Sequence, residues 1–159
     1  MEQKATLQPE EKSFMQGDKV FVDTNIIIYA YDITAGRKHQ IASKILSDMW
    51  DSGLGVVSTQ VLQEFFVNVT TKIPKPLDIK LAKEIITDLL TWNVVVIDGD
   101  FMLSGVEIHL KYQYSFWDSL IIEASIRGGS ELLLSEDLSH GQIIQGVTIK
   151  NPFHNQQGK

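Results

Sequence analysis

Four short apolar runs, separated by helix-compatible segments, constrain the fold of this chain most strongly. They are Lys19–Asp23 (KVFVD), Leu54–Ser58 (LGVVS), Val94–Ile97 (VVVI) and Glu131–Ser135 (ELLLS). Within each run the apolar residues follow one another without polar alternation, which is typical of strands buried on both faces. A shorter fifth run covers Val147–Lys150. Strands that alternate with helices favour parallel pairing.

The intervening segments have the apolar spacing of helices. In Arg37–Trp50, for example, Ile41, Ile45 and Met49 recur every four residues. Helices are expected at 24–31, 37–50, 60–71, 78–90, 100–112 and 117–126. The sequence therefore predicts an α/β fold, a three-layer sandwich whose central parallel sheet has about five strands.

The length of 159 residues fits one domain. We expect a polar N-terminal tail at 1–18, a single domain at 19–153 and a C-terminal tail at 154–159. Cysteine is absent, which excludes a disulfide scaffold and Cys-ligated zinc. No apolar run approaches the ~20 residues of a membrane span, and residues 1–17 do not resemble a signal peptide. No membrane association and a cytoplasmic location are therefore expected.

The net charge of −6 argues against a broad basic surface for nucleic acid, although bound metal ions would reverse the local sign. Functional groups of an open parallel sheet gather beyond the carboxyl ends of its strands. Four acids follow strands or open helices near that edge. They are Asp23, Glu64, Asp118 and Asp137.

Each acid also has an ordinary structural interpretation. Asp23 is a good helix cap for the segment after it. Glu64 lies beside the apolar stripe of its helix, which favours a solvated side chain. Asp118 falls within an apolar stripe, but a role as the N-cap of its helix is an alternative. Asp137 is compatible with an ordinary turn. A chemical role is favoured only if the four carboxylates come together at one edge of the sheet.

Convergence would require cations. Two carboxylates ~5 Å apart repel by roughly 3 kcal/mol at an effective dielectric near 20. Ligand sets made only of oxygen select Mg²⁺ or Mn²⁺. Such ions activate water and stabilise the leaving oxygen of a phosphodiester. Metal-assisted phosphodiester hydrolysis is the chemistry that a cluster of this kind serves best.

At these residues the chain resembles the PIN-domain family, and within it the VapC-like ribonuclease toxins of type II toxin–antitoxin pairs. The resemblance runs from about Lys19 to Phe153. It is carried by KVFVDTNIIIYAYD, by STQVLQEFF, and by YSFWDSLIIEAS followed by LLLSEDLSHGQ and VTIKNPF.

The resemblance implies a Mg²⁺- or Mn²⁺-dependent endoribonuclease with an RNA substrate, a homodimer, and a small antitoxin that covers the site. It assigns the metal site to the four acids Asp23, Glu64, Asp118 and Asp137, and supporting roles to Asn25 and Ser135. Ser119 stands where the family more often has Ala.

The fourth motif, SEDLSHG, departs from the usual Thr-x-Asp-x-x-Phe, which leaves a choice between two adjacent acids. Either side chain has the reach for a metal. The resemblance places the fourth acid two residues after the small hydroxyl residue Ser135, and so favours Asp137. We then expect Glu136 to project away and to be solvated.

Other residues have weaker assignments. Arg37, Lys38, Lys72 and Lys75 are candidate RNA contacts, against the commoner alternative of scattered surface charge. The Asp98-Gly99-Asp100 segment predicts a turn and helix cap, and His140 a solvated loop residue. The large aromatics are expected in the core or a dimer interface. They are Trp50, Trp92, Phe65 and Phe66.

Two other functions remain open. A phosphatase of the haloacid-dehalogenase type also begins with an Asp after the first strand, but it requires a second Asp two residues later, where this chain has Asn25. A PIN-like module that binds RNA or protein without cutting is the non-enzymatic alternative.

Overall fold

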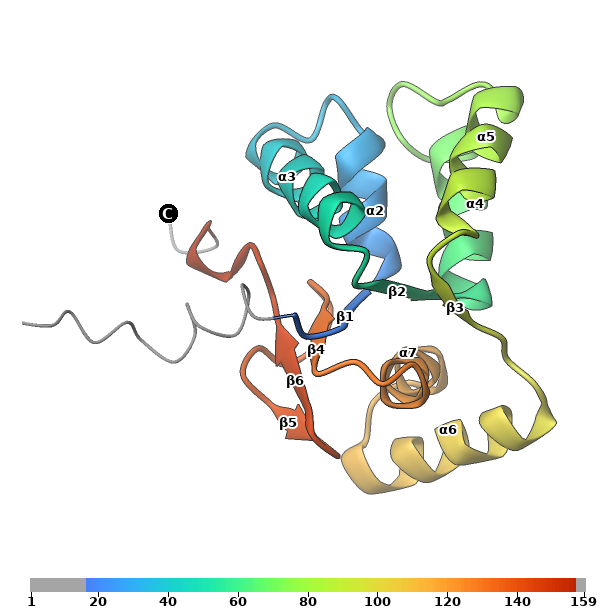
Figure 1. Ribbon diagram of the computed structural model, residues 1–159, viewed down its shortest axis with the longest axis vertical. Coiled ribbons are helices and arrows are strands. Elements are labelled where there is room, and N and C mark those ends of the chain that lie inside the picture. Colours follow the sequence, from blue (N-terminus) through green and yellow to red (C-terminus); the bar gives the residue numbers. More distant parts are fainter. Residues whose placement is uncertain (1–16, 157–159) are drawn as a thin grey trace, which may run out of the picture.

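The computed structural model describes residues 17–156 and places a central sheet between two layers of helices (Figure 1). The strand order is β3-β2-β1-β4-β6-β5. The strands are β1 Val20–Val22, β2 Gly55–Ser58, β3 Asn93–Val95, β4 Leu132–Leu134, β5 Ile143–Ile144 and β6 Val147–Lys150. Five strands pair in parallel and β5 pairs antiparallel with β6. The predicted three-layer α/β fold is confirmed, with β5 as an additional edge strand.

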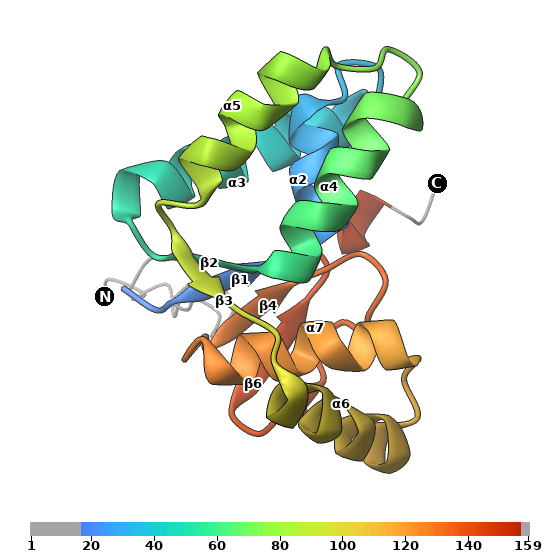
Figure 2. The same cartoon turned by 90° about the vertical axis from the view of Figure 1, so that its right-hand side faces the viewer.

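Helices cover both faces of the sheet (Figure 2). The helices that precede β3 in the chain lie on one face, and those between β3 and β4 lie on the other. Their bounds agree with the predicted helices to within two residues. They are α2 Thr24–Tyr31, α3 Arg37–Ser52, α4 Thr59–Thr71, α5 Ile79–Leu89, α6 Gly99–Tyr112 and α7 Phe116–Arg127, followed by the 3₁₀ turn η1 at His154–Gln156.

The central strands are buried on both faces, as their continuous apolar runs predicted. Phe21 lies in register with Val56 on one side and Leu133 on the other, and all three are fully buried. Val22 pairs with Leu134. This register places the next residues of β1 and β4 side by side at the carboxyl edge of the sheet.

Local expectations for capping and core packing were largely met. The carboxylate of Asp98 accepts a hydrogen bond from the backbone N–H of Phe101, so the predicted turn and cap is confirmed. Phe65 is fully buried in the core, whereas Trp50 is 42% exposed and packs edge-on against Trp92. His140 lies in a turn as expected, but its side chain is half-buried and stacks on His154, so the expectation of full solvation is wrong.

No helix within residues 17–156 is both long and apolar enough to cross a bilayer. The predicted N-terminal tail falls almost wholly on residues 1–16, and the last part of the C-terminal tail on residues 157–159, which lie outside the described residues.

Gly55 at the start of β2 provides a test of core packing. A Cβ at this position would lie 2.5 Å from Cε3 of Trp92, so Gly55→Ala must displace the indole ring. We expect a loss of about 1–3 kcal/mol in the free energy of unfolding, measured by urea denaturation. Gly99→Ala is the matched control, because a Cβ there meets nothing within 4 Å. Equal stability of the two variants would contradict the predicted overlap.

Candidate metal centre

Asp23 is the buried centre of the candidate site, directly after β1. Its Oδ1 accepts a hydrogen bond of 2.7 Å from the backbone N–H of Thr24, so it also caps α2. Its Oδ2 accepts a 2.7 Å hydrogen bond from the hydroxyl of Ser135, which follows β4. The helix-cap and site interpretations of Asp23 are therefore compatible.

Glu64 is held in the second turn of α4 by two side chains. Its Oε2 accepts a 2.6 Å hydrogen bond from the Thr24 hydroxyl, and its Oε1 a 3.0 Å bond from the amide of Gln60. The same amide also donates to the backbone carbonyl of Trp117, one residue before Asp118. The expectation of a solvated Glu64 is wrong, because the start of α2 lies against this face of α4.

Asp118 lies in the first turn of α7 and is half-buried. The helix cap is Ser115, whose hydroxyl accepts a hydrogen bond from the backbone N–H of Asp118. Since Ser115 performs the capping, the alternative of Asp118 as the cap is wrong. Burial raises the pKa of the Asp118 carboxyl, and a hydrogen bond with the Ser115 side chain opposes this rise.

Asp137 and Glu136 point into different surroundings after β4. Asp137 is exposed, and its Oδ2 accepts a 3.0 Å hydrogen bond from the amide of Asn25. Glu136 instead contacts Tyr29 and Lys38. Glu136 projects away from the other acids as expected, but it is not solvated, because an ion pair and a phenol hydroxyl cover it.

Shared hydrogen-bond partners bring the candidate acids to one edge of the sheet, since Thr24 contacts both Asp23 and Glu64, and Ser135 contacts both Asp23 and Asp137. Burial raises the pKa of Asp23 to about 7; the hydrogen bonds from Ser135 and Thr24 oppose this rise, and the charges of Glu64 and Asp137 add to it. Burial also raises the pKa of Asp118, with further contributions from Asp137 and Glu64. Each of the two buried or half-buried acids therefore senses carboxylates from distant parts of the chain.

This donor set fits a hard divalent cation. It consists of carboxylate oxygens, which Mg²⁺ and Mn²⁺ prefer, and it is destabilised until positive charge arrives. Among residues 17–156, no three His, Asp or Glu side chains already stand close enough to hold one ion together.

The candidate RNA contacts occupy two places. Arg37 and Lys38 open α3, while Lys72 and Lys75 follow α4. Arg37, Lys72 and Lys75 are exposed. Lys38 is half-buried and its ammonium group lies 2.7 Å from Glu136 Oε2, so its charge already has a partner.

Comparison with known families decides the classification. The PIN domain model matches residues 20–143. The chain belongs to the PIN-domain family.

Solved structures share the fold at low identity. A toxin–antitoxin complex from Klebsiella pneumoniae has a TM-score of 0.60 and 20% identity, covering 84% of this chain and 98% of that one. VapC20 of Mycobacterium tuberculosis, a toxin that cleaves the sarcin–ricin loop, has a TM-score of 0.55 and 18% identity over 72% and 87% of the two chains. DNA-bound VapBC from Salmonella typhimurium has a TM-score of 0.58 and 14% identity, covering 84% of this chain and 98% of that one. No curated protein sequence matches significantly.

Three residues that contact the candidate acids or cap their helices were missed by the sequence reasoning. Thr24 lies inside the Asp-Thr-Asn segment, where it was treated only as part of the motif. Gln60 lies four residues before Glu64, a spacing at which helical side chains meet. Ser115 lies three residues before Asp118, the spacing of a capping pair.

The raised pKa of Asp23 predicts how stability depends on pH without metal. The folded state holds this proton to about pH 7 while the unfolded carboxyl releases it near 3.8, so burial of Asp23 costs stability as pH rises from 4 to 7. At pH 8 in EDTA, Asp23→Asn should therefore have a higher melting temperature than the wild type. The difference in the free energy of unfolding should be at most about 4 kcal/mol. Thermal unfolding of both proteins from pH 5 to 8 measures how this difference depends on pH. A gap that does not grow with pH would contradict the assignment.

Proposed function

We propose that this PIN domain is a metal-dependent endoribonuclease that hydrolyses RNA phosphodiester bonds, and that it is the toxin of a toxin–antitoxin pair. The observation that carries the proposal is the set of contacts that brings the acids to one edge of the sheet. Thr24 donates hydrogen bonds to both Asp23 and Glu64, and the Ser135 hydroxyl donates to Asp23 and accepts from the backbone N–H of Asp137. Structural neighbours that are toxins, one of which cleaves the sarcin–ricin loop, support the choice of RNA.

The proposed division of labour follows from the contacts. Asp23 supplies the innermost oxygens, fixed by Ser135 and Thr24 on its two sides. Glu64 presents a carboxylate oriented by the Thr24 hydroxyl and the Gln60 amide. Asp118 and Asp137 complete the rim. A bound Mg²⁺ or Mn²⁺ would supply Lewis-acid polarisation of the phosphate and an activated water.

The structure argues against the phosphatase alternative. The acid–base residue of that chemistry would occupy the position of Asn25, but the amide of Asn25 is a hydrogen-bond donor to Asp137 and carries no transferable carboxyl proton. The non-cleaving alternative gains no support either, since all four acids are present and three have oriented partners. Turnover itself needs the following experiment.

Purified protein should cleave single-stranded RNA in Mg²⁺ or Mn²⁺ and stop when EDTA is added. Asp23→Asn should lower the rate by at least about 100-fold, because the innermost charged ligand is lost. Fluorescent RNA resolved on gels gives the rate. Lys44→Met, on the exposed surface of α3, is the matched control and should cut like the wild type. Equal cleavage by wild type and Asp23→Asn would assign the activity to a contaminant.

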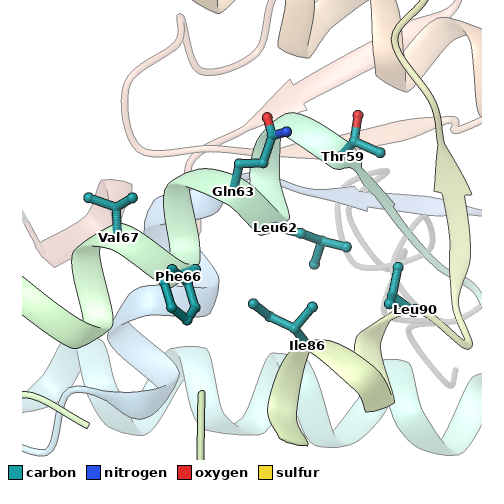
Figure 3. Close-up of a pocket in the computed structure, with 7 residues that line it drawn as sticks. All are labelled: Thr59, Leu62, Gln63, Phe66, Val67, Ile86 and Leu90. Carbon is teal, nitrogen blue, oxygen red and sulfur yellow. The ribbon is translucent and has the colours of Figure 1, made fainter. Parts of the chain in front are cut away.

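We further propose that the chain forms a homodimer and binds a small antitoxin that covers the rim, as the toxin–antitoxin neighbours suggest. Two apolar surfaces support partner binding. One is an apolar groove of about 450 Å³ between α4 and α5, lined by Leu62, Phe66 and Ile86 among others (Figure 3). The other is the exposed stripe of Leu103, Val106 and Leu110 on α6.

The molar mass measured by light scattering tests both the homodimer and the antitoxin complex. The protein alone at micromolar concentration should give twice the 17.9 kDa of one chain. Co-expression with the product of a short neighbouring reading frame should give a larger complex that no longer cuts RNA. A monomer would contradict the dimer, and a neighbour that fails to bind would contradict the toxin assignment while leaving the nuclease assignment intact.

A further inference from the structure

Glu136 forms the centre of a contact network that the four-acid site does not include. Its Oε1 accepts a 2.8 Å hydrogen bond from the hydroxyl of Tyr29 on α2. Its Oε2 lies 2.7 Å from the ammonium group of Lys38 on α3. Both carboxylate oxygens are thus engaged, and the side chain is only 17% exposed.

Aromatic rings form the floor of this network. The ammonium group of Lys38 lies 5.0 Å from the ring centre of Tyr29 and 5.6 Å from that of Phe153. The two rings pack edge to face, and Phe153 is fully buried. Partial burial and the two ring faces strengthen the ion pair relative to one in open solvent. The network therefore joins α2, α3, the segment after β4 and the C-terminal segment.

Asp137 needs such an anchor more than the other acids do. It is exposed, and it lies in a segment without helix or strand structure. Its carboxylate has one hydrogen bond, from Asn25, and its backbone N–H donates to the hydroxyl of Ser135. The residue immediately before it, Glu136, is the one held firmly on the other side of the chain. Because Glu136 and Asp137 are adjacent, holding the Glu136 side chain also restricts the backbone from which the Asp137 side chain projects.

We propose that Glu136 is a positioning residue, which with Lys38 and Tyr29 holds the backbone after β4 so that the carboxylate of Asp137 faces the other three acids. This inference rests on the proposed metal site. It also excludes two simpler roles. Glu136 is not itself a metal ligand, because its charge is already paired with the ammonium group of Lys38. For the same reason Lys38 is not a free phosphate contact.

The direction in which Lys38→Met changes cation affinity distinguishes a positioning role from a purely electrostatic one. Lys38→Met removes a positive charge near the acids, which by charge alone would tighten cation binding. If Lys38 acts by holding Glu136, the same change frees the segment and weakens binding. Tyr29→Phe removes one contact of Glu136 without any change of charge. Lys44→Met is the matched control, since it removes the same charge from the same helix at an exposed pair with Asp48.

The experiment measures Mn²⁺ affinity by titration calorimetry on the RNA-free protein, with melting temperatures in EDTA to establish folding. Lys38→Met should weaken Mn²⁺ binding about tenfold. Tyr29→Phe should weaken it in the same direction by less, and Lys44→Met should leave it unchanged. The double variant Lys38→Met/Glu136→Gln should lose no more than the worse single variant, since both remove the same link.

Unchanged or tighter Mn²⁺ binding by Lys38→Met would overturn the proposal and would leave Glu136 as a candidate ligand. If Lys38→Met fails to fold, Tyr29→Phe decides by the same criterion. Asp137→Asn tests whether Asp137 is a ligand at all.

If this variant leaves Mn²⁺ affinity unchanged, Asp137 is not the fourth ligand, and the positioning role of Glu136 is wrong as well. If the wild type binds Mn²⁺ but cuts no RNA, the proposed function fails and the positioning role is still decided by affinity.

Discussion

The burial of one carboxylate, that of Asp23, is the constraint on which this site depends. A buried charge is costly unless hydrogen bonds or an opposite charge compensate it. Two hydrogen bonds, from Ser135 and Thr24, oppose the cost, while the charges of Glu64 and Asp137 increase it. The remaining destabilisation is one that a cation relieves, so the same arrangement that weakens the metal-free protein favours metal binding.

The topology of the sheet provides the means to hold such a group. β1 lies between β2 and β4, and its three residues are buried, so the backbone that carries Asp23 is fixed on both sides. The pairing of Val22 with Leu134 brings the Ser135 hydroxyl to Asp23. Helices α2 and α4 both begin at the same edge, after β1 and β2, which lets Thr24 reach Glu64. Neutral hydroxyl and amide groups thus orient the charged ones without neutralising them.

The sequence predicted well wherever a single periodic pattern determined the outcome. The continuous apolar runs gave four strands and a fifth short one, and the helices followed from spacing and capping residues. The two-residue strand β5 was missed because so short a segment has no periodicity; the turn to β6, with Gln145 and Gly146 at positive φ, creates it.

Side-chain partners were the part that local pattern could not supply. Glu64 was expected in solvent from its place beside an apolar stripe, yet its partner Thr24 lies 40 residues away. Glu136 was expected in solvent because the fourth acid was assigned to its neighbour Asp137, yet its partners Tyr29 and Lys38 lie on two other elements. Helical and strand periodicity report which face a residue occupies. They do not report which side chain from another element meets it there.

The adjacent acids Glu136 and Asp137 carry the same charge, but the fold gives their side chains different partners. Glu136 meets a cation, so its charge is neutralised and its carboxylate serves to join elements. Asp137 meets a neutral amide, so no cation offsets its carboxylate, and it contributes to the raised pKa of Asp118. A cation binds where charge is left unpaired, and Asn25 orients the Asp137 carboxylate without pairing that charge. The position of the proposed metal site therefore depends on where Lys38 lies as well as on where the carboxylates lie.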